Sequence, residues 1–324
     1  MNYRVHAALL VTYVALTPAT VFAQVTSSVS DSTQVQVWLS PGYGEGELTW
    51  NIAHPSGSPD VLSQLDYQNL ELITGELGVR LEYEQSPQAR LILESSILFG
   101  SIRGGDAQDR DWLGDNRTDL VSLSTAHVDG DHVARLSLAF GYQVPVTDWL
   151  SLSPMMGYDH REQKLNFIDG VQVVSVPNGD FTPPAPGPFA GLNSYYETEW
   201  RSLWFGLETQ LAPAPRHTLS IRATYHLPKF DAVATWNLRT DFAQPNSFEH
   251  ETNDGHGYRL QLSYGYELTR HWQLQLGLNW EKFRMEDGVD RLHFVEPQVI
   301  TAYSPLNEVQ WKQWGINAGL SWRF

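Results

Sequence analysis

The 324-residue sequence contains no cysteine, and this absence excludes a disulfide-stabilised scaffold and any cysteine-ligated metal site. Basic residues are also scarce, because 21 Lys plus Arg stand against 37 Asp plus Glu, which gives a formal net charge of −16. Nucleic-acid binding requires clustered basic side chains that neutralise phosphates. No nucleic-acid partner is therefore expected.

A long apolar run is missing beyond the first 23 residues, so no transmembrane helix is expected there. Residues 1–23 themselves begin with Arg4, continue as an apolar stretch from Ala7 to Phe22, and end at a small residue, Ala23. This order of basic, apolar and small residues is typical of a secretory signal peptide. We expect a mature domain of residues 24–324.

The mature chain is rich in segments where apolar and polar residues alternate. In the last nine residues, Ile316–Phe324, every second residue is apolar, and the same pattern recurs in 134–142, 203–211, 258–268 and 272–280. The polar faces carry too many Arg, Glu and Gln residues for a dry core. An apolar outside and a polar inside are typical of transmembrane β-barrels, although a soluble sandwich strand is the alternative for the last segment.

Turn signals give the number of strands. Short turns are predicted near Glu84–Gln88, Val144–Asp148, Ala212–Arg216 and Thr269–His271, and long polar segments near 40–60, 100–132, 160–197, 227–256 and 283–310. Four short turns and five long loops predict an all-β fold, a ten-stranded antiparallel transmembrane barrel over about residues 33–324. Since periplasmic turns are short in this class, the five long loops should be extracellular and both termini of the mature chain periplasmic.

An acidic pair lies in the second long segment. Asp109 and Asp111 are two residues apart, so that their side chains share one face of an extended strand. Two carboxylates at close range can share a proton or hold a water molecule, because each charge opposes ionisation of the other. A solvated surface turn is the plainer interpretation of the same residues. A calcium site is less favoured, because the EF-hand spacing is not met.

The sequence around this pair resembles the omptin family, outer-membrane endopeptidases built as ten-stranded barrels. The matching stretches are Ser63–Tyr67, Gly100–Gly105, Asp109–Trp112 and His127, with lower similarity over the rest of the mature chain, including Gly157 and Tyr158. The resemblance implies that Asp109 and Asp111 match the family's aspartate pair. It also implies that Glu47 matches an acid that receives a basic substrate side chain.

The resemblance breaks at the family's Asp-x-His, in which the histidine activates water. Following the strand from Ala223 without gaps places Thr235 and Asn237 at those two positions. Neither side chain can act as a general base near neutral pH. A catalytic histidine must therefore come from elsewhere if the chain is a peptidase.

Asp254-Gly255-His256 lies further along the chain and is predicted to supply this dyad. His256 would take a proton from a water molecule held opposite the aspartate pair, and Asp254 would fix the tautomer of the ring. His226 and His250 are alternatives. Solvated loop histidines are the plainer interpretation.

Two functions follow from these residues. The first is an omptin-like endopeptidase that cleaves exposed cationic peptides near basic residues, at the extracellular face of the outer membrane. The resemblance implies lipopolysaccharide as its activating lipid, with Tyr158, Arg161 and Lys164 as the expected contacts, and no metal or other cofactor. The second is a barrel without peptidase activity that serves as a surface binding or structural protein. A general porin is a weaker option, because ten strands leave a narrow lumen.

Overall fold

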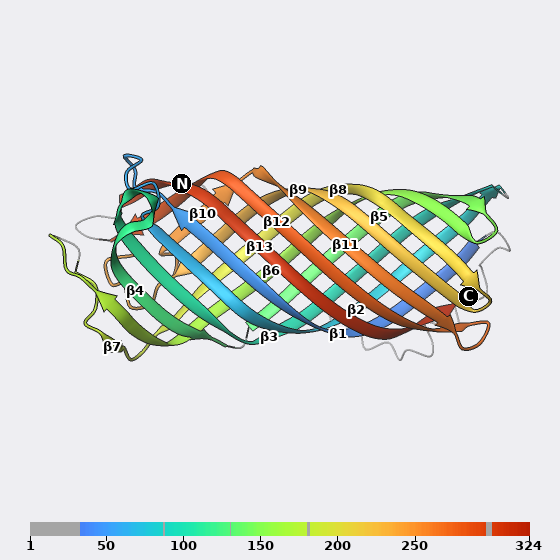
Figure 1. The fold of residues 1–324 in the computed structure, drawn as a ribbon, viewed down its shortest axis with the longest axis horizontal. Helices are drawn as coiled ribbons and strands as arrows, with labels where there is room; N and C mark the ends of the chain where they lie inside the picture. Colours follow the sequence, from blue (N-terminus) through green and yellow to red (C-terminus); the bar gives the residue numbers. More distant parts are fainter. Residues whose placement is uncertain (1–32, 87, 130, 180–181, 296–299) are drawn as a thin grey trace.

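The structure, a computed structural model, describes residues 33–324 apart from residues 87, 130, 180–181 and 296–299 (Figure 1). Its elements are β1 (Thr33–Ile52), β2 (Ser63–Ser86), β3 (Ala89–Gly114), the 3-10 turn η1 (Asp115–Arg117), β4 (Thr118–Val128), β5 (Asp131–Thr147), β6 (Leu150–Ser175), β7 (Gly187–Pro188), β8 (Asn193–Ala214), β9 (His217–Thr235), β10 (Phe248–Thr252), β11 (Asp254–Glu267), β12 (Trp272–Phe294) and β13 (Ile300–Arg323). The predicted signal peptide, residues 1–23, lies outside the described residues. In the described part, no helix is long and apolar enough to cross a membrane.

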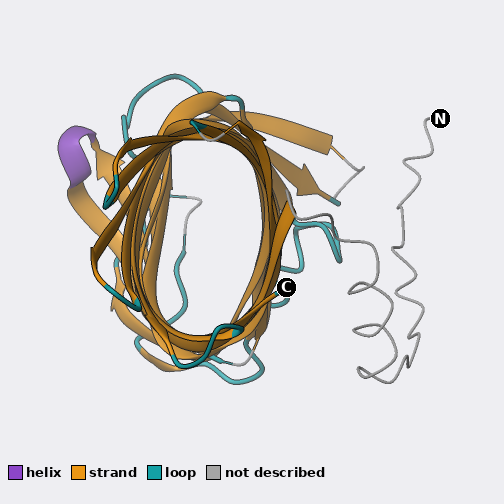
Figure 2. Ribbon diagram, turned by 90° about the vertical axis from the view of Figure 1, so that its right-hand side faces the viewer, coloured by secondary structure: helices purple, strands orange, loops and turns teal. Residues whose placement is uncertain are grey.

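Of the thirteen β-elements in the described residues, twelve form a closed ring of ten antiparallel strands. β4 and β5 are successive parts of one strand of the ring, because both pair with β3 and β6. β10 and β11 are related in the same way, between β9 and β12. The two-residue β7 pairs with β6 alone. β1 pairs with β13 and closes the ring, and Figure 2 shows the closed barrel viewed along its axis. The predicted ten-stranded barrel is confirmed.

The two ends of the barrel differ in their connections. At the end that we call the turn end, short connections join β2 to β3, β5 to β6, β8 to β9, and β11 to β12, as predicted. Thr33 and Phe324 lie at this same end, where the Phe324 amide donates to the Val35 carbonyl at 2.9 Å. The opposite end, which carries η1, β7 and the longer connections, is called the loop end (Figure 1).

The connections at the loop end are shorter than the polar segments from which they were predicted, because the strands continue through much of those segments. β1 runs to Ile52 and β3 to Gly114, so the expected boundaries near residues 40 and 100 lie within strands. The reason is a change of face. Near the loop end the apolar residues of β1 point inward, as the complete burial of Leu48 shows, and the outward alternation that marks a lipid-facing strand is lost.

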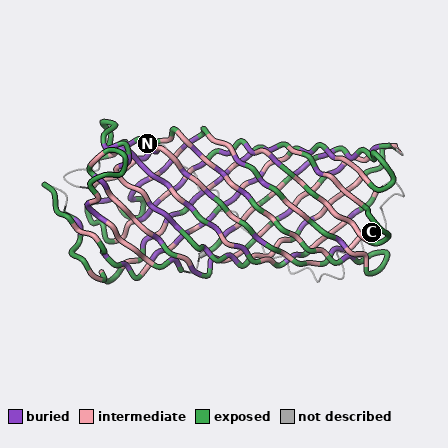
Figure 3. The backbone as a smooth tube through the Cα atoms, viewed as in Figure 1, coloured by how far each residue is buried: buried purple, intermediate pink, exposed green. Residues whose placement is uncertain are grey.

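A band of exposed apolar side chains surrounds the half of the barrel nearer the turn end. Along its strands, exposed residues alternate with residues that are partly or fully buried (Figure 3). The band includes Leu39, Ile73, Leu77, Leu93, Ile97, Leu136, Leu138, Phe140, Met156, Leu203, Phe205, Leu207, Ile221, Leu260, Leu274, Leu276, Leu278, Ile316 and Leu320. Exposed apolar side chains on every part of a closed ring match a lipid-facing surface. We call this surface the apolar band.

The lumen at the loop end is filled by buried apolar side chains, which we call the apolar plug. Its members are Leu48, Trp50, Ile52, Leu65, Tyr67, Leu70, Leu72, Ile102, Ala107, Val128, Val133, Leu165, Phe167, Tyr196, Trp200, Phe230, Ala232, Ala234, Phe248, Phe283, Met285, Leu306, Val309 and Trp311. The barrel therefore has an apolar core on the inside near its loop end and an apolar surface on the outside near its turn end.

Candidate functional site

The acidic pair faces the lumen because of an irregularity in the β2–β3 hairpin. The register shifts between Gln68 and Glu71, and opposite this shift Gly105 adopts a φ of +155°. A β-carbon at Gly105 would lie 2.9 Å from the Gln68 carbonyl oxygen, so glycine is required there. On β3 the inward positions are even-numbered as far as Ile102 and odd-numbered from Ala107 to Asp111, which turns the acidic pair inward.

Asp109 and Asp111 lie beyond the apolar band, close to Ser63. The Ser63 hydroxyl is 3.5 Å from Asp109 Oδ1 and donates to it. Burial, reinforced by the charge of Asp111, raises the pKa of Asp109 well above its ordinary value. Burial also raises the pKa of Asp111, although hydrogen bonds from Ser63 and Ser122 and the charge of Arg239 oppose that shift. The raised pKa of Asp109, to which the Asp111 charge contributes, agrees with the predicted crowding, whereas the raised pKa of Asp111 has burial as its cause.

These raised pKa values make stability depend on pH in a defined direction. An acid with a raised folded pKa binds more protons when folded than when unfolded, so its contribution is complete below about pH 3.9 and is lost as the pH rises through the folded pKa. We expect the free energy of unfolding of Asp109→Asn to fall less steeply with rising pH than that of the parent. At neutral pH the variant should therefore be more stable than the parent. Urea unfolding of the refolded protein between pH 3 and pH 8 measures the effect. Asp119→Asn, at an exposed position of the same segment, is the control; an equal gain in both variants would contradict the assignment.

Glu47, predicted to receive a basic substrate side chain, lies on the outer wall. Its neighbours along β1 point inward: Leu48 is fully buried, and a β-carbon at Gly46 would lie 2.6 Å from the Trp311 ring. Because side chains alternate along a strand, Glu47 points outward, where its carboxylate lies 3.6 Å from Lys312 Nζ. The structure does not bring Glu47 to the acidic pair.

The predicted dyad also lies on the outer wall. Added β-carbons at Gly255 and Gly257 would meet Met285 and Phe283 of the apolar plug, so these two glycines face inward. Asp254 and His256 therefore point outward, and the His256 ring packs edge-on against Tyr258 at 5.7 Å. The prediction that they stand opposite Asp109 and Asp111 across the lumen is corrected by this alternation.

A different histidine faces the lumen at the loop end. His250 Nδ1 lies 2.7 Å from the Tyr196 hydroxyl, and its Nε2 lies 3.4 Å from Asp290 Oδ1. His250 and Asp290 are each 1% exposed, and they face one another across the β10–β12 pair. No local motif in the sequence indicates this pair, because forty residues separate its members. The ring of Trp50 lies edge-on at 4.8 Å and encloses the histidine further.

Aromatic rings separate His250 from the acidic pair. Tyr67, whose pKa is raised by burial and by the Asp109 charge, stacks on Tyr196 with ring centroids 6.3 Å apart and an interplanar angle of 15°. Both tyrosines are fully buried. Neighbouring side chains therefore run from Asp109 through Tyr67, Tyr196 and His250 to Asp290.

The other residues singled out in the sequence have structural partners. His226 is fully buried and lies 2.9 Å from Thr224 Oγ1 and 3.2 Å from Ser202 Oγ. Asn237 accepts from Ser194 Oγ at 3.0 Å, and Thr235 Oγ1 donates to the carbonyl of Pro245. Thr235 and Asn237, the two residues at the omptin Asp-x-His positions, thus form hydrogen bonds to neighbouring segments at the loop end.

The three residues expected at a lipid site are divided between the two walls. Arg161 lies in the lumen, where it pairs with Glu281, and this placement corrects its assignment to a lipid-facing position. Lys164 lies on the outer wall, 2.9 Å from Glu197 Oε1 and 4.0 Å from the centre of the Tyr195 ring. Tyr158 precedes the inward-facing Asp159 and shares this outer face.

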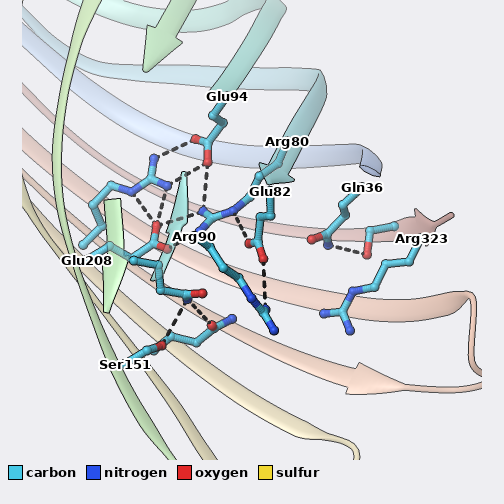
Figure 4. Close-up of polar contacts among 12 residues, drawn as sticks. Gln36, Arg80, Glu82, Arg90, Glu94, Ser151, Glu208 and Arg323 are labelled. Atoms are coloured by element: carbon cyan, nitrogen blue, oxygen red, sulfur yellow. Dashed lines mark hydrogen bonds and ion pairs between the residues drawn. The ribbon is translucent and has the colours of Figure 1, made fainter. Parts of the chain in front are cut away.

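Two clusters of charged side chains, most of them buried, cross the lumen on the turn-end side of the apolar plug. The turn-side cluster consists of Arg80, Glu82, Arg90, Glu94, Glu208 and Arg222, of which Arg80, Glu82, Arg90, Glu94 and Glu208 are labelled in Figure 4. The central cluster consists of Asp159, Arg161, Arg259 and Glu281. In the central cluster Arg259 lies 2.6 Å from Asp159 and 2.9 Å from Glu281. Alternating cations and anions offset the cost of burying each charge.

A cavity of about 570 Å³ occupies the lumen from the turn end to the central cluster, and the turn-side cluster forms part of its wall. Its lining reaches the turn residues Thr147, Asp148 and Trp149 and extends inward to Arg161 and Glu281. We call it the turn chamber. In the described residues, no three His, Asp or Glu side chains converge as a metal site.

A closed ring of ten strands with an apolar outer band and a charged lumen defines an outer-membrane β-barrel protein. The chain belongs to the family described as "Protochlamydia outer membrane protein", whose model matches residues 38–324. No curated protein matches the sequence.

The solved structure of an outer membrane protease shows the same kind of fold. The outer membrane protease OmpT from Escherichia coli is similar with a TM-score of 0.73 and 16% identity, over 92% of this chain and 100% of that chain. The translocator domain of the autotransporter NalP from Neisseria meningitidis has a TM-score of 0.38 and 10% identity, over 94% and 93% of the two chains. At such identities the similarity to OmpT bears on the fold alone.

Proposed function

We propose that this outer-membrane barrel has no peptidase activity and acts at the cell surface as a binding protein for cationic peptides or proteins. The observation that carries the proposal is the apolar plug. Tyr67 and Tyr196 fill the space between the acidic pair and His250, and a peptide needs that space to reach both groups. General-base catalysis requires the base within hydrogen-bond reach of the attacking water.

The exposed partner surface is proposed to be the rim of the loop end. In this class of barrel short turns face the periplasm, which assigns the loop end to the cell exterior. Within the segment 103–129, the exposed charged residues are Asp106, Asp115, Asp119 and Asp129 against Arg103 and Arg117. This excess of carboxylates, on a chain of net charge −16, attracts cationic partners over distances near the Debye length.

Lipopolysaccharide remains the proposed lipid partner, with a revised set of contacts. Tyr158 and Lys164 share the outer wall with Arg201, and Leu203, 63% exposed, lies two residues further along β8 toward the apolar band. Basic and phenolic side chains next to a lipid-facing band suit the phosphates of a lipid headgroup. A phosphate would have to replace the carboxylates that now pair with Lys164 and Arg201, and both cations are partly exposed. Arg201 thus takes the place that Arg161 cannot fill from the lumen.

One observation favours the peptidase alternative. The Asp109–Asp111 pair and the His250–Asp290 pair lie on opposite walls of the lumen. An assay that decides between the functions uses a fluorogenic dibasic peptide with refolded protein in lipopolysaccharide-containing detergent. We expect no cleavage by the parent. Cleavage that is lost in both Asp109→Asn and His250→Ala, and kept in the outer-wall control His256→Ala, would overturn the proposal.

Peptide binding provides the positive test. We expect a labelled cationic peptide to bind the parent at low ionic strength and to dissociate as salt is added. Replacing Asp106, Asp115, Asp119 and Asp129 together by Asn should weaken binding about tenfold, because four rim charges are removed. The control is Glu84→Gln with Asp148→Asn at the turn end, which should leave binding unchanged. Equal affinity in the rim variant and the parent would contradict the assigned surface.

A further inference from the structure

The turn chamber is closed on one side and reachable from the other. The apolar plug and the central charge cluster close it toward the loop end, whereas its lining extends to the residues of the β5–β6 turn. Its volume of about 570 Å³ lies within the range of about 300–1,000 Å³ typical of small-molecule sites. A ligand would therefore enter from the turn end.

The charges that line the chamber are already paired. Arg80 lies 2.8 Å from Glu82, 3.1 Å from Glu94 and 2.8 Å from Glu208, so one guanidinium contacts three carboxylates (Figure 4). Arg222 bridges Glu94 and Glu208 in the same way. A charged ligand would have to compete with these pairs and break them. A neutral ligand can instead use the hydrogen-bonding edges that remain.

Side-chain amides lie in two groups on facing parts of the wall. On β1, β12 and β13, Gln36 Nε2 donates to Ser321 Oγ at 2.9 Å and to Gln273 Oε1 at 3.4 Å. On β5, β6 and β8, Gln143 Nε2 donates to Gln210 Oε1 at 2.9 Å and to Ser151 Oγ at 3.1 Å. Gln36, Ser151 and Arg323 are labelled around the chamber in Figure 4. These bonds fix the amide planes before any ligand arrives.

Each group keeps unused hydrogen-bonding capacity. Among the described residues, no hydrogen bond is made by Gln36 Oε1, by Gln143 Oε1 or by the Gln210 amide nitrogen. Such amides offer both acceptors and donors. A ligand hydroxyl group, which donates one hydrogen bond and accepts others, matches this combination.

An indole lies beside the amides on the inner wall. The Trp38 ring lies over Gly78, where any added β-carbon would overlap it, and the ring lines the chamber while remaining only partly buried. An aromatic face packs against apolar C–H surface, while the fixed amides satisfy hydroxyl groups at its edge. The chamber thus combines a flat apolar face with neutral polar edges.

We propose that the turn chamber binds a short neutral saccharide, which packs a ring face on Trp38 and directs its hydroxyl groups to Gln36 and Gln143. Saccharides present an apolar face and many hydroxyl groups without charge, which is the combination that the chamber accommodates. This site is distinct from the peptide-binding rim at the loop end. Either proposal can fail while the other stands.

The test is titration of the refolded full chain with two disaccharides, N,N′-diacetylchitobiose and maltose, followed by tryptophan fluorescence and calorimetry. The first probe carries the acetamido groups of cell-wall glycans, and the second represents glucans. We expect saturable binding of at least one probe. Gln143→Met should weaken binding about tenfold, because methionine has a similar length but lacks the amide. Trp38→Leu should weaken binding at least as much.

Controls distinguish loss of the site from loss of the fold. Gln310→Met, on the outer wall between the inward-facing Val309 and Trp311, should bind as the parent does. Without heating, each variant must migrate on a gel as the folded parent barrel does. Trp38→Phe, which retains an aromatic face, should keep most of the affinity that Trp38→Leu loses. Absence of binding by the folded parent, or unchanged affinity in both Gln143→Met and Trp38→Leu, would overturn the proposal.

Discussion

Replacing Arg259 by methionine is expected to lower the free energy of unfolding by about 3–5 kcal/mol, because it leaves two buried carboxylates without their shared cation. Arg259 lies 2.6 Å from Asp159 and 2.9 Å from Glu281 in the lumen. Indole donors hold these acids in place, with Trp204 Nε1 3.1 Å from Asp159 and Trp311 Nε1 2.8 Å from Glu281. Neither carboxylate can therefore turn toward water without disturbing the packing. Urea unfolding in detergent, followed by tryptophan fluorescence, measures the loss.

The matched control is Arg284→Met on the outer wall. Arg284 also contacts two carboxylates, Glu286 at 2.9 Å and Glu308 at 2.7 Å, but it is 43% exposed. Ion pairs at such positions contribute about 0–1 kcal/mol, because water screens them and solvates the remaining charges. Similar losses in the two variants would show that the central cluster does not carry the stability assigned to it.

The barrel and its strand count could be predicted because the lipid imposes one rule on every spanning strand. Each must present apolar residues outward at every second position, as Leu260, Leu262 and Tyr264 do on β11. The strand ends could not be predicted in the same way. Beyond the lipid the rule reverses, and Leu48, Trp50 and Ile52 place their apolar side chains in the lumen.

The candidate site was harder to predict because one residue of register decides which wall a side chain occupies. The β2–β3 bulge turns Asp109 and Asp111 inward, as expected, whereas Glu47 and His256 fall on outward positions between inward-facing neighbours. Sequence spacing does not reveal such a shift. The His250–Asp290 contact depends on pairing between distant strands and leaves no local motif.

The lipid-facing assignment of the apolar band leads to the last expected result. Leu276→Arg should lower the free energy of unfolding in lipid bilayers by about 2–4 kcal/mol, the cost of an arginine on the lipid face near the bilayer midplane. Leu276 is 47% exposed and lies on β12 midway between Trp272 and Trp280, two exposed indoles suited to the two interfaces of the membrane.

The neighbouring residue provides the control for this experiment, because Gln275 lines the turn chamber on the opposite face of the same strand. Gln275→Arg adds the same charge to a polar lumen and should cost less than about 1 kcal/mol, since lumen substitutions avoid the lipid. Refolding into vesicles and urea unfolding compare the two variants directly. A smaller loss for Leu276→Arg than for Gln275→Arg would mean that this face of β12 does not contact lipid, because adjacent residues of one strand differ only in the wall that they face.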